Sequence, residues 1–146
     1  MADLTWLLVR NNNSFLVKRN GVQFTSEPNN LTNTNSFKYS GLANNKAIGI
    51  IPNNSSPSSK KAKGVTVISK KTKTASYKPV KGINKVNLTK GVRKSAKSFI
   101  NSYTRADYRP DLRKDALARI SAIYQSQKPI KVHIRKTGSR HTKKQK

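Results

Sequence analysis

The first apolar residues of the chain recur at helical spacing. Three leucines stand at positions i, i+3 and i+4 behind Asp3, a residue type suited to a helix N-cap: Leu4, Leu7 and Leu8. They predict a short amphipathic helix from about residue 3 to residue 10. Trp6 lies close to the apolar face, so we expect it to pack in the core; the alternative is that its ring stacks on a nucleic-acid base.

Strand-like patterns follow. Two β-branched and aromatic runs flank Asn20-Gly21, a dipeptide that favours the positive φ angles of a type I′ turn. They predict a hairpin of about residues 14–19 with residues 22–26. The segment NNSSPSSKKAK has the composition of a surface loop, and a further strand is predicted on each side of it, at residues 46–51 and 64–69. These elements indicate a small antiparallel sheet that carries one helix.

From residue 70 the pattern changes. The stretch SKKTKTASYKPVKGINK is basic, punctuated by Gly and Pro and without period, so it predicts an extended arm. Two amphipathic helices are predicted after it. The first spans about residues 89–103, with an apolar stripe of Val92, Ala96, Phe99 and Ile100. The second spans YRPDLRKDALARISAIYQSQ, where Pro110 and Asp111 suit a first turn, and its stripe is Leu112, Ala116, Ile120, Ile123 and Tyr124.

The pattern divides the chain into three parts. Residues 1–75 are predicted to form a small α+β globular domain, residues 76–127 a basic arm with two amphipathic helices, and residues 128–146 a basic tail that is disordered without a partner. The predicted fold class is therefore α+β: a small antiparallel sheet with an N-terminal helix, followed by basic helices and extended basic arms. Hydrophobic residues make up 34% of the chain, below the ~45–50% typical of globular domains, so we expect a small core.

Charge points to the partner. The 146 residues include 31 Lys and Arg but only 5 Asp and Glu, a net charge of +26. Residues 1–59 hold 5 of the basic residues, which leaves 31 − 5 = 26 for residues 60–146. Such a chain repels itself, and its complement is a polyanion: nucleic acid, an anionic membrane surface or an acidic protein. Small folds with basic arms are typical of proteins that thread into folded RNA, so RNA is favoured and a chromatin protein is an alternative.

The predicted RNA contacts are basic side chains, which bind phosphate by charge and counterion release. Arg10 and Arg19 are expected to grip phosphate or a base edge in two places, whereas Lys18 is either a contact or a solvated strand residue. Tyr77 and the stretch YTRADY place ring faces beside cations, as recognition of looped RNA often requires. The predicted RNA-binding residues are Arg10, Lys18, Arg19, Lys38, Tyr39, Lys70, Lys71, Lys73, Lys78, Arg93, Lys94, Lys97, Arg105, Arg109, Arg113, Lys114, Arg119, Lys128, Lys131, Arg135 and Lys136.

Residues for catalysis are scarce. Three of the five carboxylates are better explained as helix-start or salt-bridging residues: Asp107, Asp111 and Asp115. His133 and His141 lie in the basic tail, where nothing would hold a proton-transfer geometry. There is no cysteine, Walker A loop, GxGxxG or HExxH motif. We therefore expect no enzyme, no cofactor, no metal and no small-molecule substrate. No apolar run approaches the ~20 residues of a membrane span, and no membrane partner is expected.

Three stretches resemble a known family. LTWLLVRNNNSFLVKRN, SEPNNLTNTNSFKYSGL and YRPDLRKDALARISAIYQSQKPIKV are similar, in the family's order, to the eukaryotic large-subunit ribosomal protein numbered twenty-eight in the eukaryotic series. The resemblance covers about half of the chain; residues 52–107 and the tail match in character alone.

The resemblance implies a small α+β domain with no enzymatic role. It implies a structural constituent of the cytosolic large ribosomal subunit that binds ribosomal RNA, supports translation, and is present as a single copy per ribosome beside neighbouring ribosomal proteins. The implied location is the cytoplasm, with transit through the nucleolus during assembly. Because a related domain occurs in a nucleolar factor, the alternative is a ribosome-assembly factor that binds pre-ribosomal RNA.

The segment from Ser26 to Leu42 is rich in asparagine although it follows the hairpin. Asn side chains both donate and accept hydrogen bonds and tolerate left-handed backbone, so we expect an ordered, irregular loop that satisfies its own polar groups. Glu27-Pro28 would end the hairpin and Phe37 would anchor the loop in the core, while Lys38 and Tyr39 would face RNA. An A+T-biased genome is the alternative explanation for asparagine runs such as NNN.

Overall fold

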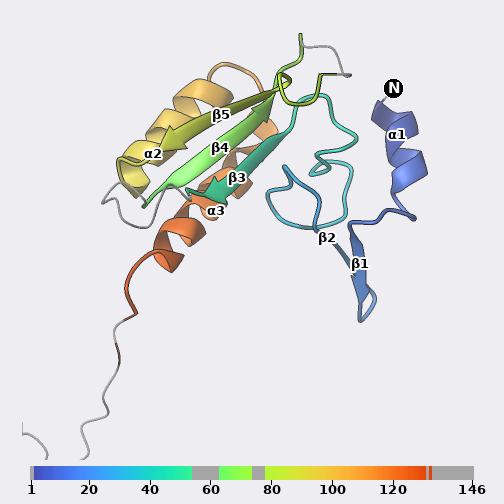
Figure 1. Cartoon of the computed structure of the whole chain (residues 1–146), viewed down its shortest axis with the longest axis horizontal. Helices are drawn as coiled ribbons and strands as arrows, with labels where there is room; N and C mark the ends of the chain where they lie inside the picture. The colour runs from blue at the N-terminus through green and yellow to red at the C-terminus, as the bar shows by residue number, and fades with distance from the viewer. Residues whose placement is uncertain (1, 54–62, 74–77, 131, 133–146) are drawn as a thin grey trace, which may run out of the picture.

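A computed structural model describes residues 2–53, 63–73, 78–130 and 132 (Figure 1). Within these ranges the helices and strands confirm a mixed α+β fold. In chain order they are α1 (Ala2–Val9), β1 (Leu16–Arg19), β2 (Val22–Thr25), β3 (Ile48–Pro52), β4 (Val65–Lys70), β5 (Ile83–Leu88), α2 (Val92–Phe99), a π-helical turn (Ile100–Thr104), a 3-10 turn (Pro110–Leu112) and α3 (Arg113–Ser126).

The predicted hairpin is confirmed. β1 and β2 pair antiparallel, with Arg19 opposite Val22. The turn residues Asn20 and Gly21 have φ angles of 49° and 75°, which are the left-handed values that a type I′ turn needs and that Asn and Gly tolerate best. The local sequence signal was sufficient here because a two-residue turn fixes the register of both strands.

The second sheet has three antiparallel strands in the order β3-β4-β5. β3 and β4 were predicted, but β5 lies in part of the stretch that was predicted to be an extended arm, and there the prediction was wrong. β5 pairs with β4 along its length, with Val86 opposite Val67. As an edge strand it exposes residues 84–87, so polar side chains are tolerated and the alternation that marks a strand is weak.

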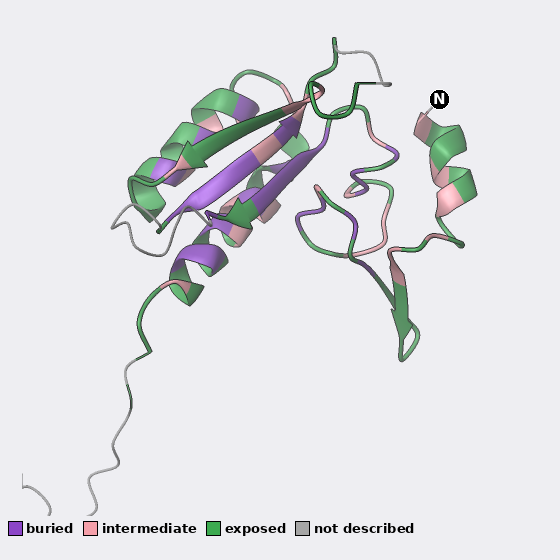
Figure 2. Cartoon of the chain, in the orientation of Figure 1, coloured by how far each residue is buried: buried purple, intermediate pink, exposed green. Residues whose placement is uncertain are grey.

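The hydrophobic core lies between this sheet and the helices α2 and α3 (Figures 1 and 2). The stripe predicted for α3 is confirmed, since all five residues are buried. The stripe predicted for α2 is confirmed at Phe99 alone. Ser95 and Tyr103 are buried instead of the other predicted members, Val92, Ala96 and Ile100. The core includes residues from both sides of residue 75: Leu31, Ile48, Ile50, Val65, Val67, Phe99, Tyr103, Leu112, Ala116, Ile120, Ile123 and Tyr124.

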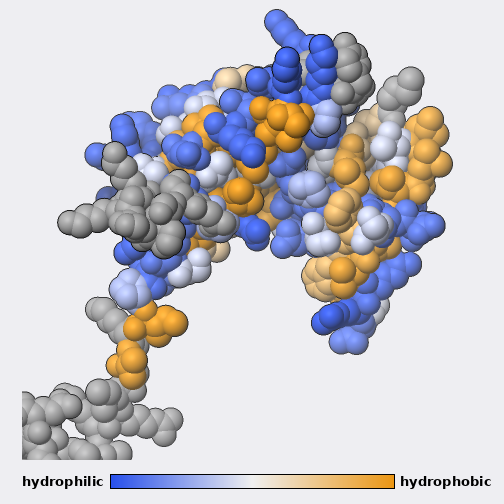
Figure 3. All heavy atoms as spheres, viewed as in Figure 1, coloured by the Kyte–Doolittle hydropathy of each residue, from blue (hydrophilic) through white to orange (hydrophobic). Residues whose placement is uncertain are grey.

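α1 stands beside the hairpin (Figure 1), and hydrophobic residues gather on the surface of this region (Figure 3). The predicted helix is confirmed, but Leu4, Leu7 and Leu8 are 58–71% exposed. The predictions that Trp6 and Phe37 belong to the core were wrong. Phe37 is exposed, Trp6 is half-buried, and their ring centroids lie 5.9 Å apart. The two rings therefore fasten α1 to the loop after the hairpin, outside the main core.

The asparagine-rich loop satisfies its own polar groups, as predicted. Asn29 and Asn33 have φ angles of 62° and 57°, in the left-handed region. The side chain of Asn30 is buried: its amide nitrogen donates to Glu27 Oε1 and to the Thr34 carbonyl, both at 3.1 Å. Its Oδ1 accepts from the backbone N–H of Asn33 at 2.8 Å and from that of Thr32 at 3.1 Å. The loop is thus an ordered surface without regular strands.

Like Asn30, Glu27 accepts several hydrogen bonds that hold the loop together. This buried carboxylate accepts hydrogen bonds from the backbone N–H of Gly41 at 3.1 Å and from the hydroxyl of Ser40 at 3.3 Å. The loop then packs against β3 at Gly49, where a Cβ atom would lie 2.6 Å from Asn29 Oδ1. Glycine is therefore required at position 49 by close approach.

Candidate nucleic-acid interface

Several basic residues predicted to bind RNA have partners within the protein. Lys70 is half-buried at the end of β4, and its ammonium group donates to the carbonyls of Gly41 and Asn44, the latter at 3.1 Å. Burial lowers the pKa of Lys70 below its usual value, and the negative charge of Glu27 partly opposes this shift. Lys70 thus connects the sheet to the asparagine-rich loop, and its ammonium group is turned inward.

Arg109 is a second internal contact. Its Nε and Nη2 donate to the two carboxylate oxygens of Asp111, both at 2.8 Å, and the remaining donors reach the carbonyls of Lys46 at 2.7 Å and Lys38 at 2.9 Å. The Arg109 side chain is 15% exposed. Its hydrogen bonds lower the pKa of Asp111, because they favour the charged carboxylate. This fork fastens the loop to the start of α3.

Lys38 and Tyr39 share Asp115 on α3. The Tyr39 hydroxyl donates to Asp115 Oδ2 at 3.0 Å, and Lys38 Nζ lies 3.8 Å from the same oxygen. The explanation of Asp111 and Asp115 as salt-bridging residues is therefore confirmed. Lys38 keeps 47% of its side chain exposed. Arg119 is largely enclosed, and its Nε is buried without a hydrogen-bond partner among the described residues.

Tyr103 and Tyr108, in and after the π-helical turn, make contacts within the protein. Tyr103 is buried and stacks on Phe99 with a centroid distance of 5.2 Å, and Tyr108 meets Tyr103 edge-on at 6.0 Å. The Tyr108 hydroxyl donates to the Lys70 carbonyl at 2.5 Å, and burial raises its pKa. The expectation of a ring face available to a base was wrong for Tyr103, which the core buries. Tyr108 is partly exposed, and the Lys46 ammonium group lies 5.7 Å from the centre of its ring.

The other predicted residues are distributed over the exposed surface. They occupy the α1–hairpin region, the turn after β4, the outer side of α2 and the start and end of α3. The exposed basic residues are Arg10, Lys18, Arg19, Lys71, Lys73, Lys78, Arg93, Lys94, Lys97, Arg105, Arg113, Lys114 and Lys128. Sequence reasoning did not single out five further exposed lysines: Lys46, Lys63, Lys81, Lys85 and Lys90. Outside the described residues lie positions 54 to 62 of the NNSSPSSKKAK segment, nearly all of the tail, Tyr77, Lys131, His133, Arg135, Lys136 and His141.

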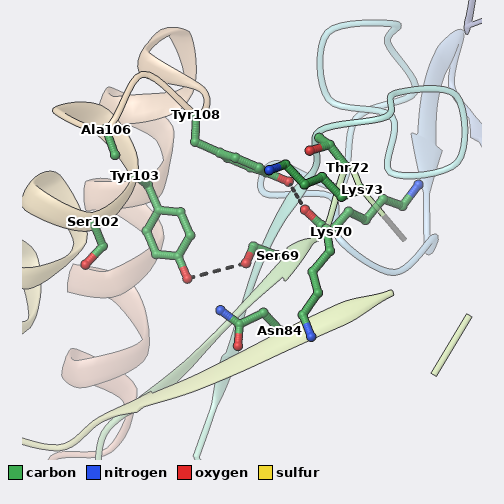
Figure 4. Close-up of a pocket in the computed structure, with 10 residues that line it drawn as sticks. Ser69, Lys70, Thr72, Lys73, Asn84, Ser102, Tyr103, Ala106 and Tyr108 are labelled. Carbon is green, nitrogen blue, oxygen red and sulfur yellow. Dashed lines mark hydrogen bonds between the residues drawn. The ribbon is translucent and has the colours of Figure 1, made fainter. Parts of the chain in front are cut away.

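A hollow of about 460 Å³ opens beside this surface (Figure 4). It lies between the end of β4, the start of β5 and the π-helical turn. We call it the β4–β5 hollow. Its lining combines lysines with hydroxyl and amide groups: Ser69, Lys70, Lys71, Thr72, Lys73, Asn84, Ser102, Tyr103, Ala106 and Tyr108. Asn84 and Ser102 were missed by sequence reasoning, because neither carries charge and β5 was not recognised.

In the part of the chain that the structure describes, no group of three or more His, Cys, Asp or Glu residues is placed to hold a metal ion. No helix in the same ranges is both long and apolar enough to cross a membrane.

Comparison with known proteins decides the family. The model of the ribosomal L28e protein family matches residues 4–126, which includes every helix and strand after the first residues of α1. The chain belongs to the ribosomal L28e protein family. Proteins named large ribosomal subunit protein eL28 are 42% identical in Schizosaccharomyces pombe, over 88% of this chain and 94% of that protein, and 32% identical in Dictyostelium discoideum, over 97% of both chains. The resemblance read from the three stretches is thereby confirmed, and the family match extends across residues 52–107.

Proposed function

We propose that this chain is a structural constituent of the cytosolic large ribosomal subunit, that it binds ribosomal RNA through its exposed basic surface, and that it supports translation in this way. One observation carries the proposal: exposed cations stand on the hairpin, after β4, on α2 and at both ends of α3, while three of the five carboxylates, Glu27, Asp111 and Asp115, are bonded within the protein. The uncompensated charge therefore faces outward. The relatives are named large ribosomal subunit protein eL28, and ribosomal RNA in that subunit would be the polyanion that complements this charge.

The proposed mechanism has two parts. The loop supplies a rigid shape, because Arg109 fixes it to the start of α3, Lys70 fixes it to the sheet, and Glu27 holds its two ends together. The hairpin is joined to the loop by a backbone hydrogen bond from Thr25 to Asn33. The exposed lysines and arginines then neutralise phosphates and release their counterions. We propose a single copy beside neighbouring ribosomal proteins, located in the cytoplasm after passing through the nucleolus. No catalytic step belongs to this mechanism.

Salt dependence tests the RNA-binding mechanism. If about eight phosphates are neutralised, the logarithm of the association constant for a folded ribosomal RNA fragment should fall with log salt with a slope on the order of −6. Replacing Arg93, Lys94 and Lys97 on α2 by Gln should reduce the slope by about 2, because three phosphate contacts are lost. A control that exchanges Lys and Arg at these positions keeps the charge and should keep the slope. A slope near zero for the unaltered chain would refute the mechanism.

Sedimentation tests the assembly. The endogenous protein should move with mature large subunits and polysomes on a high-salt sucrose gradient, as a structural constituent does. Confinement to nuclear precursor particles would instead show a ribosome-assembly factor that binds pre-ribosomal RNA, and the proposed role in translating ribosomes would be wrong even if RNA binding held.

A further inference from the structure

The β4–β5 hollow has the size of a small-ligand site. Its volume of about 460 Å³ falls within the ~300–1,000 Å³ range of pockets that hold small molecules. A paired RNA helix is convex and contacts such a surface from outside, whereas a single base displaced from a helix or loop can enter it. The shape therefore favours a ligand that projects from the RNA.

The polar groups of the hollow form two chemical classes. Lys71 and Lys73 are exposed cations whose side chains have no ion pair or hydrogen bond within the described residues. Asn84 carries both a donor and an acceptor at the end of its side chain, and this side chain, like the Ser102 hydroxyl, has no hydrogen-bond partner among the residues that the structure describes. In Figure 4 the Asn84 amide lies beside the long contact of 3.5 Å between the hydroxyls of Ser69 and Tyr103.

Each class matches one half of a nucleotide. Ammonium groups bind phosphate, and the amide and hydroxyl groups can pair with the edge of a base, which offers both donors and acceptors. A lone phosphate would leave the Asn84 amide unused, and a carboxylate or acidic peptide would not require it either. Tyr103 is buried with its ring stacked on Phe99, and the Tyr108 ring is engaged by Tyr103 and by the Lys46 ammonium group. Hydrogen bonding, rather than ring stacking, would therefore supply the recognition of the base.

We propose that the β4–β5 hollow receives one unpaired nucleotide that projects from ribosomal RNA. Lys71 and Lys73 hold its flanking phosphates, and Asn84 bonds the edge of its base. The inference rests on the proposed function, because it needs an RNA ligand, but it adds a base-reading position that phosphate contacts alone do not give.

The test compares two RNA hairpins with the same stem, one fully paired and one with a single bulged nucleotide, made in four versions that differ in the bulged base. Binding of the full chain is measured by fluorescence anisotropy at one salt concentration. We expect at least one bulged version to bind roughly tenfold more tightly than the paired hairpin, the discrimination that one well-placed set of base hydrogen bonds gives.

Two matched variants separate base reading from charge. Asn84→Ala should abolish the preference for the bulged RNA and leave affinity for the paired hairpin unchanged. Lys114→Gln, on the exposed side of α3, should weaken both RNAs by the same factor. Equal affinity of the unaltered chain for paired and bulged RNA, or a preference that survives in Asn84→Ala, would overturn the proposal while leaving RNA binding intact. Absence of salt-dependent binding to any hairpin would instead overturn the proposed function.

Discussion

Asn30 gives the sharpest test of the asparagine-rich loop. The change is Asn30→Ala, at a side chain that is 6% exposed. It removes four hydrogen bonds of 3.1 Å or less, to Glu27, Thr34, Thr32 and Asn33. The loop is part of the cooperative fold, because Leu31, the next residue, belongs to the main core.

The magnitude follows from these contacts. A typical hydrogen bond contributes a net ~0.5–1.5 kcal/mol, and a buried group that loses its partner costs more. Some backbone N–H groups of the loop can regain water, so we expect Asn30→Ala to lower the free energy of unfolding by about 2–4 kcal/mol. In a chain of this size that corresponds to a fall in melting temperature of roughly 6–16 °C.

The assay is urea and thermal unfolding of the full chain at neutral pH, followed by circular dichroism, with enough salt to screen its charge. Asn12→Ala is the matched control, since Asn12 is exposed and should change stability by less than about 0.5 kcal/mol. If both variants unfold like the unaltered chain, the loop is not stabilised by its own amide groups, and the alternative that genome composition explains its asparagines gains support.

Three further changes test other contacts. Arg109→Lys cannot reproduce the fork to Asp111 and two carbonyls, so urea unfolding should show a loss of about 1–2 kcal/mol, against less than about 0.5 for exposed Arg113→Lys. The folded pKa of Asp111 is lowered, so the stabilisation of the fold by this carboxylate is present above its unfolded pKa and is lost as pH falls through the folded pKa. The difference in melting temperature between the unaltered chain and Asp111→Asn should therefore shrink below about pH 3.8. A difference that stays constant with pH would contradict this prediction. Gly49→Ala would press a methyl group on Asn29 and should cost about 1–3 kcal/mol in thermal unfolding; an unchanged melting temperature would show that the loop can move away.

Local signals in the sequence predicted the elements that depend on neighbouring residues. The Asn20-Gly21 turn and the apolar stripe of α3 are encoded within a few residues, and both are confirmed. β5 was missed because its stability comes from pairing with β4, which is distant in sequence, and its exposed polar residues obscure the strand pattern. The buried stripe of α2 was misplaced because it includes a polar residue, Ser95. The Ser95 hydroxyl can be buried because it forms a hydrogen bond of 2.8 Å with the hydroxyl of Tyr124.

The sequence predicted that the candidate interface is positively charged, but it predicted much less well which residues form it. Composition indicates that cations must face a polyanion, but it cannot show which of them find acceptors inside the protein. Lys70 and Arg109 cannot be told from exposed lysines and arginines by residue type. They differ because their side chains bond to carbonyls of segments that are distant in sequence. Asn84 carries no charge, so its place beside two lysines becomes visible only when β5 is folded.

The contacts that hold the loop also set an order in time. Tyr39 bonds to a residue 76 positions later in the chain, and Arg109 bonds back across 71 positions to Lys38. A polypeptide is made from its N-terminus at ~5–20 residues per second, so the loop leaves the ribosome several seconds before α3 exists to hold it. During synthesis, the hairpin can close alone, while Leu31 and the strands β3 and β4 must wait for the last helix with their apolar side chains uncovered. The nascent chain is therefore most in need of protection by chaperones just before α3 is made.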